Sequence, residues 1–165
     1  MSLAQTIIQE LEMEAATTRR VLERVPAEKF TWAPHAKSRT LGELAMHIAG
    51  NPGGVMTLAS QNPAEIPGFG DVTPRSTAEI LTTLDESVAE ARRMLEGMSD
   101  AQLTEQWRVH ANGREIMALP RIAFLRSVLL NHWYHHRGQL SVYLRELDVP
   151  VPSIYGPSAD ENPFE

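Results

Sequence analysis

The chain has 165 residues, 15 basic and 21 acidic side chains, and no cysteine. Its net charge of −6 disfavours nucleic-acid binding, which needs a basic surface to replace phosphate counterions. Without cysteine, a transition metal must be bound through nitrogen and oxygen. The length fits a single domain over residues 1–165. The chain begins without a basic, apolar leader and has no apolar run of bilayer length, so we expect a cytoplasmic protein that does not enter a membrane.

Capping signals predict two helices in the first part of the chain. Ser2 begins a helix that ends near Pro26, and its apolar residues recur at helical spacing. Thr40 begins a second helix. The Asn51–Gly54 sequence, NPGG, interrupts that helix and predicts a kink or break, because proline removes a backbone hydrogen bond. Asn51 is expected to act as a new N-cap there.

The second part of the chain is divided by similar signals. The expected elements are a proline- and glycine-rich loop over 62–75, a third helix over 76–97, a short helix after Ser99, an extended or hairpin segment reaching Asn112 and Gly113, and a last long helix over 120–147. A proline-rich, extended tail follows. With four long helices and no convincing alternating strands, the chain is predicted to be an all-α four-helix bundle.

Three of the six histidines lie together on the last predicted helix, in the sequence NHWYHHRGQL. His132 shares a helix face with His135 or His136, which follow it by three and four residues. A single helical histidine is usually a surface residue or a hydrogen-bonded core residue. A buried pair in an apolar stripe is costly without strong partners, and a metal ion is a common partner. A third imidazole from another helix would leave coordination positions open for water or substrate.

The helical repeat indicates which of His135 and His136 shares the inward face with His132. At roughly 100° per residue, with Leu125 set to zero, His132 lies near −20° and His136 near +20°. His135 lies near −80°, at the edge of the apolar stripe, by the same rough geometry. We therefore expect His132 and His136 to point inward. His135 would border a helix contact or a subunit interface, or support the site from outside.

Two sequence blocks carry a family resemblance: WAPHAKSRTLGELAMHIAG over 32–50 and NHWYHHRGQLSVYLRELDVPVPSIYGPSADE over 131–161. They resemble the DinB-like family, metal-binding four-helix bundles related to YfiT. The resemblance implies one divalent ion, of nickel, zinc, iron or manganese, bound by His47, His132 and His136. The chain departs from many relatives at Asn51–Gly54, where bulky or aromatic residues are usual. This leaves the shape of the pocket wall open.

The resemblance favours a metal-dependent enzyme that acts on a small molecule, either a thiol-dependent transferase or a hydrolase. No catalytic residue is assigned. The alternative is a non-catalytic, metal- or small-ligand-binding, stress-related protein, and either could be a homodimer. Glu43 would orient a ligand or bound water, or else close a capping box with Thr40. Arg137 would attract an anionic substrate, or else lie solvated on the outer face.

Overall fold

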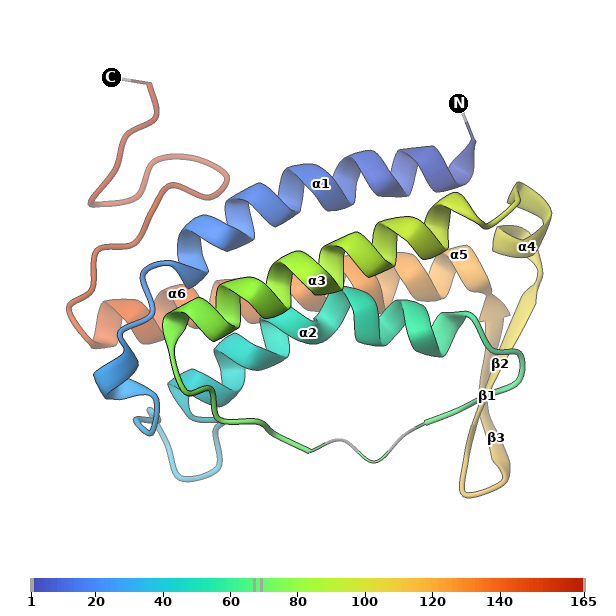
Figure 1. The fold of residues 1–165 in the computed structure, drawn as a ribbon, viewed down its shortest axis with the longest axis horizontal. Coiled ribbons are helices and arrows are strands. Elements are labelled where there is room, and N and C mark those ends of the chain that lie inside the picture. Colours follow the sequence, from blue (N-terminus) through green and yellow to red (C-terminus); the bar gives the residue numbers. More distant parts are fainter. Residues whose placement is uncertain (1, 67, 69, 165) are drawn as a thin grey trace.

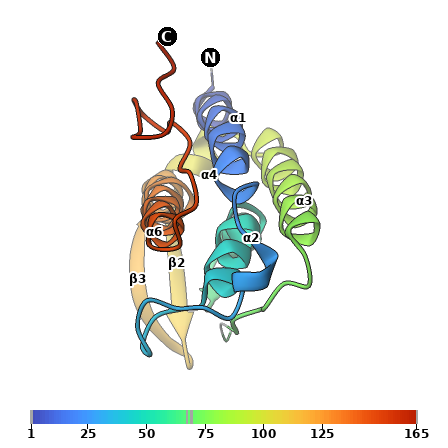
Figure 2. The same cartoon turned by 90° about the vertical axis from the view of Figure 1, so that its left-hand side faces the viewer.

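The computed structural model describes residues 2–66, 68 and 70–164, and it is mostly helical. Four long helical segments lie side by side (Figure 1), and the end-on view shows them around a common interior (Figure 2). They are α1 (Leu3–Leu22), α2 (Leu41–Ala59), α3 (Thr77–Glu96) and a composite last helix of α5 (Arg121–Phe124), η2 (Leu125–Asn131) and α6 (His132–Glu146). Two shorter elements, η1 (Ala27–Lys29) and α4 (Asp100–Thr104), lie in the connections.

The predicted helix starts are confirmed by their caps. Ser2, Thr40, Ser76 and Ser99 each accept a hydrogen bond through the side-chain oxygen from the backbone N–H three residues later. These bonds satisfy N–H groups that the first turn of a helix leaves unpaired. At Thr40 and Ser99 the residue three positions on also bonds back, which completes a capping box.

The apolar stripes of the helices meet in one core. Burying them removes apolar surface from water, which is the main force that holds the helices together. Fully buried members from all four long segments include Leu11, Leu22, Leu44, Ile48, Met56, Ile80, Leu84, Leu95, Leu129, Trp133 and Leu140.

The structure also contains a three-stranded sheet, so the expectation of an all-α fold is wrong. β1 (Ala64–Glu65) pairs in parallel with β2 (Gln106–Ala111), which pairs antiparallel with β3 (Arg114–Pro120). Asn112 and Gly113, with positive φ of 53° and 72°, form the β2–β3 turn, as the hairpin prediction required. The alternation of apolar residues was too weak to predict β3, because most of its side chains are exposed.

The predicted break in α2 is also wrong, because the helix continues through Asn51–Gly54. Its axis bends part-way along (Figure 1), so the expected kink remains. Pro52 has no N–H for the carbonyl of Ile48. The indole Nε1 of Trp133, on α6, donates to that oxygen at 2.8 Å. A partner from another helix therefore satisfies the carbonyl that proline leaves unpaired.

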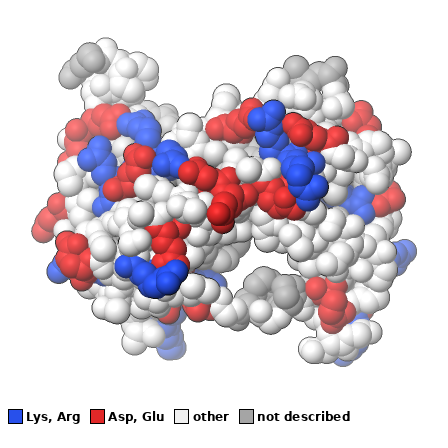
Figure 3. All heavy atoms as spheres, viewed as in Figure 1, with Lys and Arg blue, Asp and Glu red and all other residues white. Residues whose placement is uncertain are grey.

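Acidic and basic side chains are interspersed over the α1–α3 face (Figure 3). Arg19 pairs with Asp85 across the two helices, and Arg92 pairs with Glu12 at 3.1 Å. The described residues after α6 form no helix or strand, and Asp160 among them pairs with Arg145 on α6. None of the described helices combines the length and the apolar character needed to cross a bilayer.

Candidate metal centre

Three histidines from two helices converge in the interior. His47 lies on α2, whereas His132 and His136 lie one turn apart on α6. One ligand atom from each lies within 4.8 Å of the others. The ring centroids are 4.4–5.2 Å apart, and the rings are nearly perpendicular to one another. The Nε2 atoms of His132 and His136 are separated by 2.9 Å.

Two amide side chains set the tautomers of the α6 pair. The Oδ1 of Asn51 lies 3.2 Å from Nδ1 of His132, and its Nδ2 donates to the carbonyl of Leu129 at 3.1 Å. This second bond orients the amide, so the Nδ1–H of His132 must donate. The Nδ1 of His136 lies 2.6 Å from Oε1 of Gln139, and because an amide oxygen only accepts, the Nδ1–H of His136 donates to it. Both neutral rings therefore carry their proton on Nδ1, and each Nε2 presents a lone pair.

This arrangement fits a cation. Two nitrogen lone pairs face each other at 2.9 Å, and the Nε2 of His47 is buried without a hydrogen-bond partner among the described residues. Such groups repel or stay unsatisfied unless a positive charge lies among them. Three imidazoles suit zinc, nickel and iron, and outer partners on Nδ1 are the usual companions of histidine ligands.

The electrostatics favour a metal ion over a proton as that charge. Burial is the main cause that lowers the pKa of His47 to about 4, and the guanidinium of Arg39 and the other two rings add to it. Burial also lowers the pKa of His136 to about 4, against an opposing contribution from Gln139. The pKa of His132 is lowered as well, first by burial. All three rings are thus neutral near pH 7, which is the form that binds metal.

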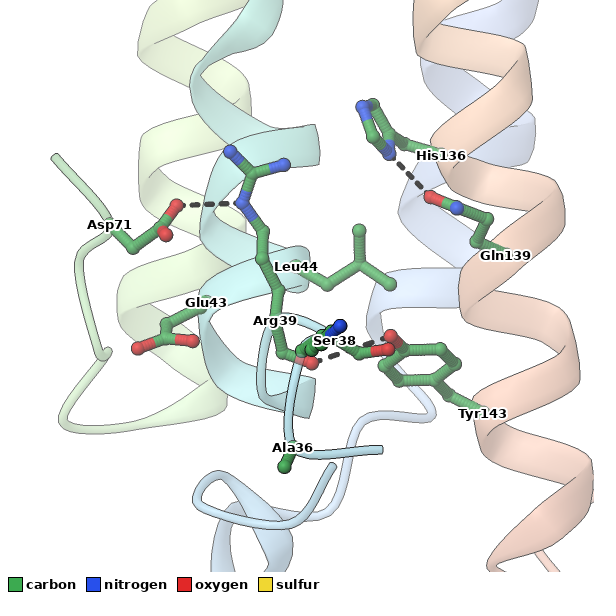
Figure 4. Close-up of a pocket in the computed structure, with 10 residues that line it drawn as sticks. Ala36, Ser38, Arg39, Glu43, Leu44, Asp71, His136, Gln139 and Tyr143 are labelled. Carbon is green, nitrogen blue, oxygen red and sulfur yellow. Dashed lines mark hydrogen bonds and ion pairs between the residues drawn. The ribbon is translucent and has the colours of Figure 1, made fainter. Parts of the chain in front are cut away.

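Two cavities flank the histidines. The polar cavity, of about 470 Å³, is lined by Lys37, Ser38, Arg39, Glu43, Asp71, His136, Gln139 and Tyr143, with Ala36 and Leu44 (Figure 4). The apolar cavity, of about 530 Å³, is lined by Met46, His47, Gly50, Asn51, Gly54, Val55, Leu58, Val128 and His132, with Arg39. The wall of the polar cavity thus includes one histidine of the cluster, and the wall of the apolar cavity includes the other two. Arg39 lies in both walls, and its Nε contacts Asp71 at 2.6 Å.

The sequence pattern of the DinB family matches residues 1–163. The chain belongs to the DinB family. A curated relative, the uncharacterized protein YrdA of Bacillus subtilis (strain 168), is 27% identical over 157 residues, which are 91% of this chain and 86% of YrdA.

Solved structures of DinB-like proteins share the fold. One from Bacillus cereus ATCC 10987 has a TM-score of 0.73 at 24% identity, with 92% of this chain and 97% of that chain covered. Another, YjoA from Bacillus subtilis, has a TM-score of 0.67 at 20% identity, with 88% and 95% covered. The small sheet is therefore part of a chain whose overall fold is DinB-like.

The structure decides two of the alternatives left open for this DinB-family chain. Glu43 closes the capping box: its Oε2 accepts from the N–H of Thr40 at 2.8 Å. It also lines the polar cavity, outside the histidine cluster. Both expectations for Arg137 are wrong, because its side chain is 1% exposed and pairs with Glu14 on α1 at 2.6 Å. A buried, paired guanidinium joins α6 to α1 and is not available to a substrate.

Helix phase separates the two adjacent histidines as expected. His136 is 9% exposed and faces the cluster, whereas His135 is exposed. The α-helical phase predicted from Leu125 does not hold over Leu125–Asn131, because this segment is a π-helix with a wider turn than an α-helix. His132 and His136 still point inward together, because both lie on α6, the α-helical part, where residues four apart share a face.

Sequence reasoning missed three residues of the site. The sequence predicts Asn51 only as a helix cap, and the predicted site includes neither Gln139 nor Arg39. Spacing could have found two of them, since Asn51 follows His47 by four residues and Gln139 follows His136 by three. Arg39 lies in a connection before α2, so only the tertiary structure brings it to the cavities.

Proposed function

We propose that His47, His132 and His136 bind one divalent metal ion, and that the protein is a metal-dependent enzyme acting on a small molecule. The four long helices would serve as the bundle that holds the ion. One observation carries the proposal: three neutral imidazoles with free ring nitrogens converge between two cavities. Among the described residues this cluster contains no carboxylate. A three-histidine set leaves coordination positions open, as catalytic metal sites require.

The ion, whether nickel, zinc, iron or manganese, would serve as a Lewis acid that activates a bound thiol or water. The residues of the chain have separate tasks. Asn51 and Gln139 hold the Nδ1 protons of the two α6 histidines, which keeps each Nε2 free. The polar cavity offers hydrogen-bonding groups from Gln139, Lys37 and Tyr143 to the polar part of a substrate.

A non-catalytic, metal- or small-ligand-binding protein is the second candidate. No substrate is assigned to the polar cavity, and its lining is also compatible with a protein that only binds a ligand. A fold by itself does not specify a reaction. The two candidates differ in turnover, because a binding protein would hold its ligand unchanged.

The first test is the metal content of protein purified without an affinity tag, measured by inductively coupled plasma mass spectrometry. We expect about one divalent ion per chain. The variant with His47, His132 and His136 all changed to alanine should contain none, while a His35→Ala variant should match the parent, because His35 is exposed and outside the cluster. Equal metal content in the triple variant would contradict the proposal.

The second test is turnover. The metal-loaded protein is assayed for transfer of low-molecular-weight thiols to electrophiles and for hydrolysis of small esters and amides. An activity that EDTA removes and that the added ion restores would support the enzyme. Metal binding without any turnover, together with retention of an unmodified small molecule, would favour the binding protein.

A further inference from the structure

Two glycines in the wall of the apolar cavity have no packing reason to be glycine. Among the described residues, a Cβ built on Gly50 or Gly54 would meet no atom within 4 Å apart from the neighbouring backbone of α2 itself. Both lie inside α2, where glycine destabilises a helix by up to about 1 kcal/mol relative to alanine. Gly53, between them, differs: a Cβ there would lie 3.2 Å from Oγ and 3.3 Å from Cα of Ser87. Close packing against α3 explains Gly53, but nothing comparable explains the other two.

The open space above these glycines belongs to the apolar cavity. Met46, Val55, Leu58 and Val128 surround it with apolar side chains, and Arg39 supplies the charged lining residue. Its volume of about 530 Å³ is in the usual range for sites that bind small molecules. Gly50 and Gly54 are one helical turn apart, so the face of α2 that forms this part of the wall carries no side chain at either position.

The same cavity reaches the histidines. His47 and His132 lie in its wall. Among the described residues, the buried Nε2 of His47 has no hydrogen-bond partner. On the other side of the cluster, His136 lines the polar cavity, where the basic Lys37 and Arg39 are balanced by the acidic Glu43 and Asp71. A molecule at the histidines would therefore meet polar groups on one side and an apolar surface on the other.

We propose that the substrate is an amphipathic small molecule whose polar head lies at the histidines and whose apolar body fills the apolar cavity, with Gly50 and Gly54 as the residues that make room for it. This rests on the proposed metal centre and deepens it by assigning a substrate class. Specificity follows from volume: a larger side chain at either glycine would occupy the space of the apolar body.

Two hydroxamates test this on the zinc-loaded protein by isothermal titration calorimetry. Acetohydroxamate carries a metal-binding head with one methyl group, and octanohydroxamate carries the same head with a long alkyl tail. Each buried methylene is worth about a fourfold gain in affinity, so burial of two or more predicts a gain of at least about tenfold for the longer probe. Equal affinities for the two probes would overturn the proposal.

Substitution of the glycines tests whether the gain in affinity from the long tail arises in the apolar cavity. Gly54→Leu should remove most of the gain from the long tail and leave the affinity for acetohydroxamate and for zinc unchanged. Thr57→Leu is the matched control, because it adds the same side chain to an exposed position of α2 outside the cavity lining. An unchanged tail gain in Gly54→Leu, or an equal loss in Thr57→Leu, would contradict the assignment.

A milder variant covers the case in which leucine disturbs the fold. The double variant Gly50→Ala/Gly54→Ala should raise Tm by about 2–4 °C per substitution, because alanine favours the helix, while it weakens octanohydroxamate selectively. A purely structural role would lower Tm instead.

Failure of acetohydroxamate and zinc to bind would contradict the metal centre. In that case octanoate binding to the metal-free parent and to this variant decides the cavity proposal separately, and equal octanoate affinities would overturn it.

Discussion

The amide of Asn51 on α2 accepts a hydrogen bond from the Nδ1–H of His132 on α6, over 3.2 Å. The same amide donates to the carbonyl of Leu129, so both of its ends are engaged with the last helix. One side chain thus sets the tautomer of a proposed ligand and joins the two helices that carry all three histidines. The residue that the sequence offered as a helix cap is a positioning residue of the site.

Replacing Asn51 with alanine should weaken zinc binding by about 10–100-fold, the usual cost of removing an outer partner of a histidine ligand. The loss arises because the Nδ1 proton of His132 is no longer held. Competition with a fluorescent chelator measures the affinity. Asn131→Ala, an exposed change on the last helix, is the control and should keep the parental value. Similar affinities in both variants would show that the amide does not support the site.

His136→Ala should reduce zinc affinity by more than the roughly 10–100-fold expected for an outer partner, because it removes a direct ligand. His135→Ala should keep most of the affinity, since that side chain is exposed. Equilibrium dialysis with metal analysis checks both. The reverse order of effects would show that the inward face of α6 has been assigned wrongly.

Removing the metal should lower Tm without unfolding the protein. A ligand at 100 times its Kd adds about 2.7 kcal/mol of stability, which for a domain of this size corresponds to roughly 5–11 °C. The apolar core extends well beyond the histidines, from Leu11 on α1 to Leu95 on α3, and should hold the helices together. Circular dichroism with and without EDTA measures both quantities. Loss of the helical signal in EDTA would mean that the ion carries the fold.

Metal affinity should begin to fall at a lower pH than it would for exposed imidazoles, and it should fall steeply as the pH approaches 4. Protonated imidazole cannot bind metal, so affinity is lost as the pH falls through the pKa values of the folded protein. Burial lowers the pKa of both His47 and His136 to about 4, below the ordinary value of 6.5. Zinc titrations in a buffer series measure the profile. A midpoint near 6.5 would indicate exposed imidazoles.

Trp133→Phe should destabilise the fold by about 1–3 kcal/mol, because it leaves the carbonyl of Ile48 buried without its donor beside Pro52. Urea unfolding measures the free energy. The control is Trp32→Phe: Trp32 is half-buried and packs edge-on against Tyr143. A smaller loss in Trp133→Phe than in the control would contradict the role of the indole N–H as the donor to Ile48.

Local patterns in the sequence determined the helix starts and the inward pair on the last helix. Caps act within three residues, and His132 and His136 share a face because of the helical repeat alone, so neither depends on distant parts of the chain. The same patterns predicted the β2–β3 turn, because Asn112 and Gly113 readily adopt positive φ.

Only the tertiary structure decided how α2 meets α6. The carbonyl that Pro52 leaves unpaired in α2 is satisfied by a donor 85 residues away, and Nδ1 of His132 bonds to an amide 81 residues away. The burial of Arg137 likewise required Glu14 on α1. Such contacts arise from the packing of whole helices, which periodicity along one segment does not encode. The histidine cluster therefore combines a pair that local geometry determines with a third ring that only the assembled core brings to it.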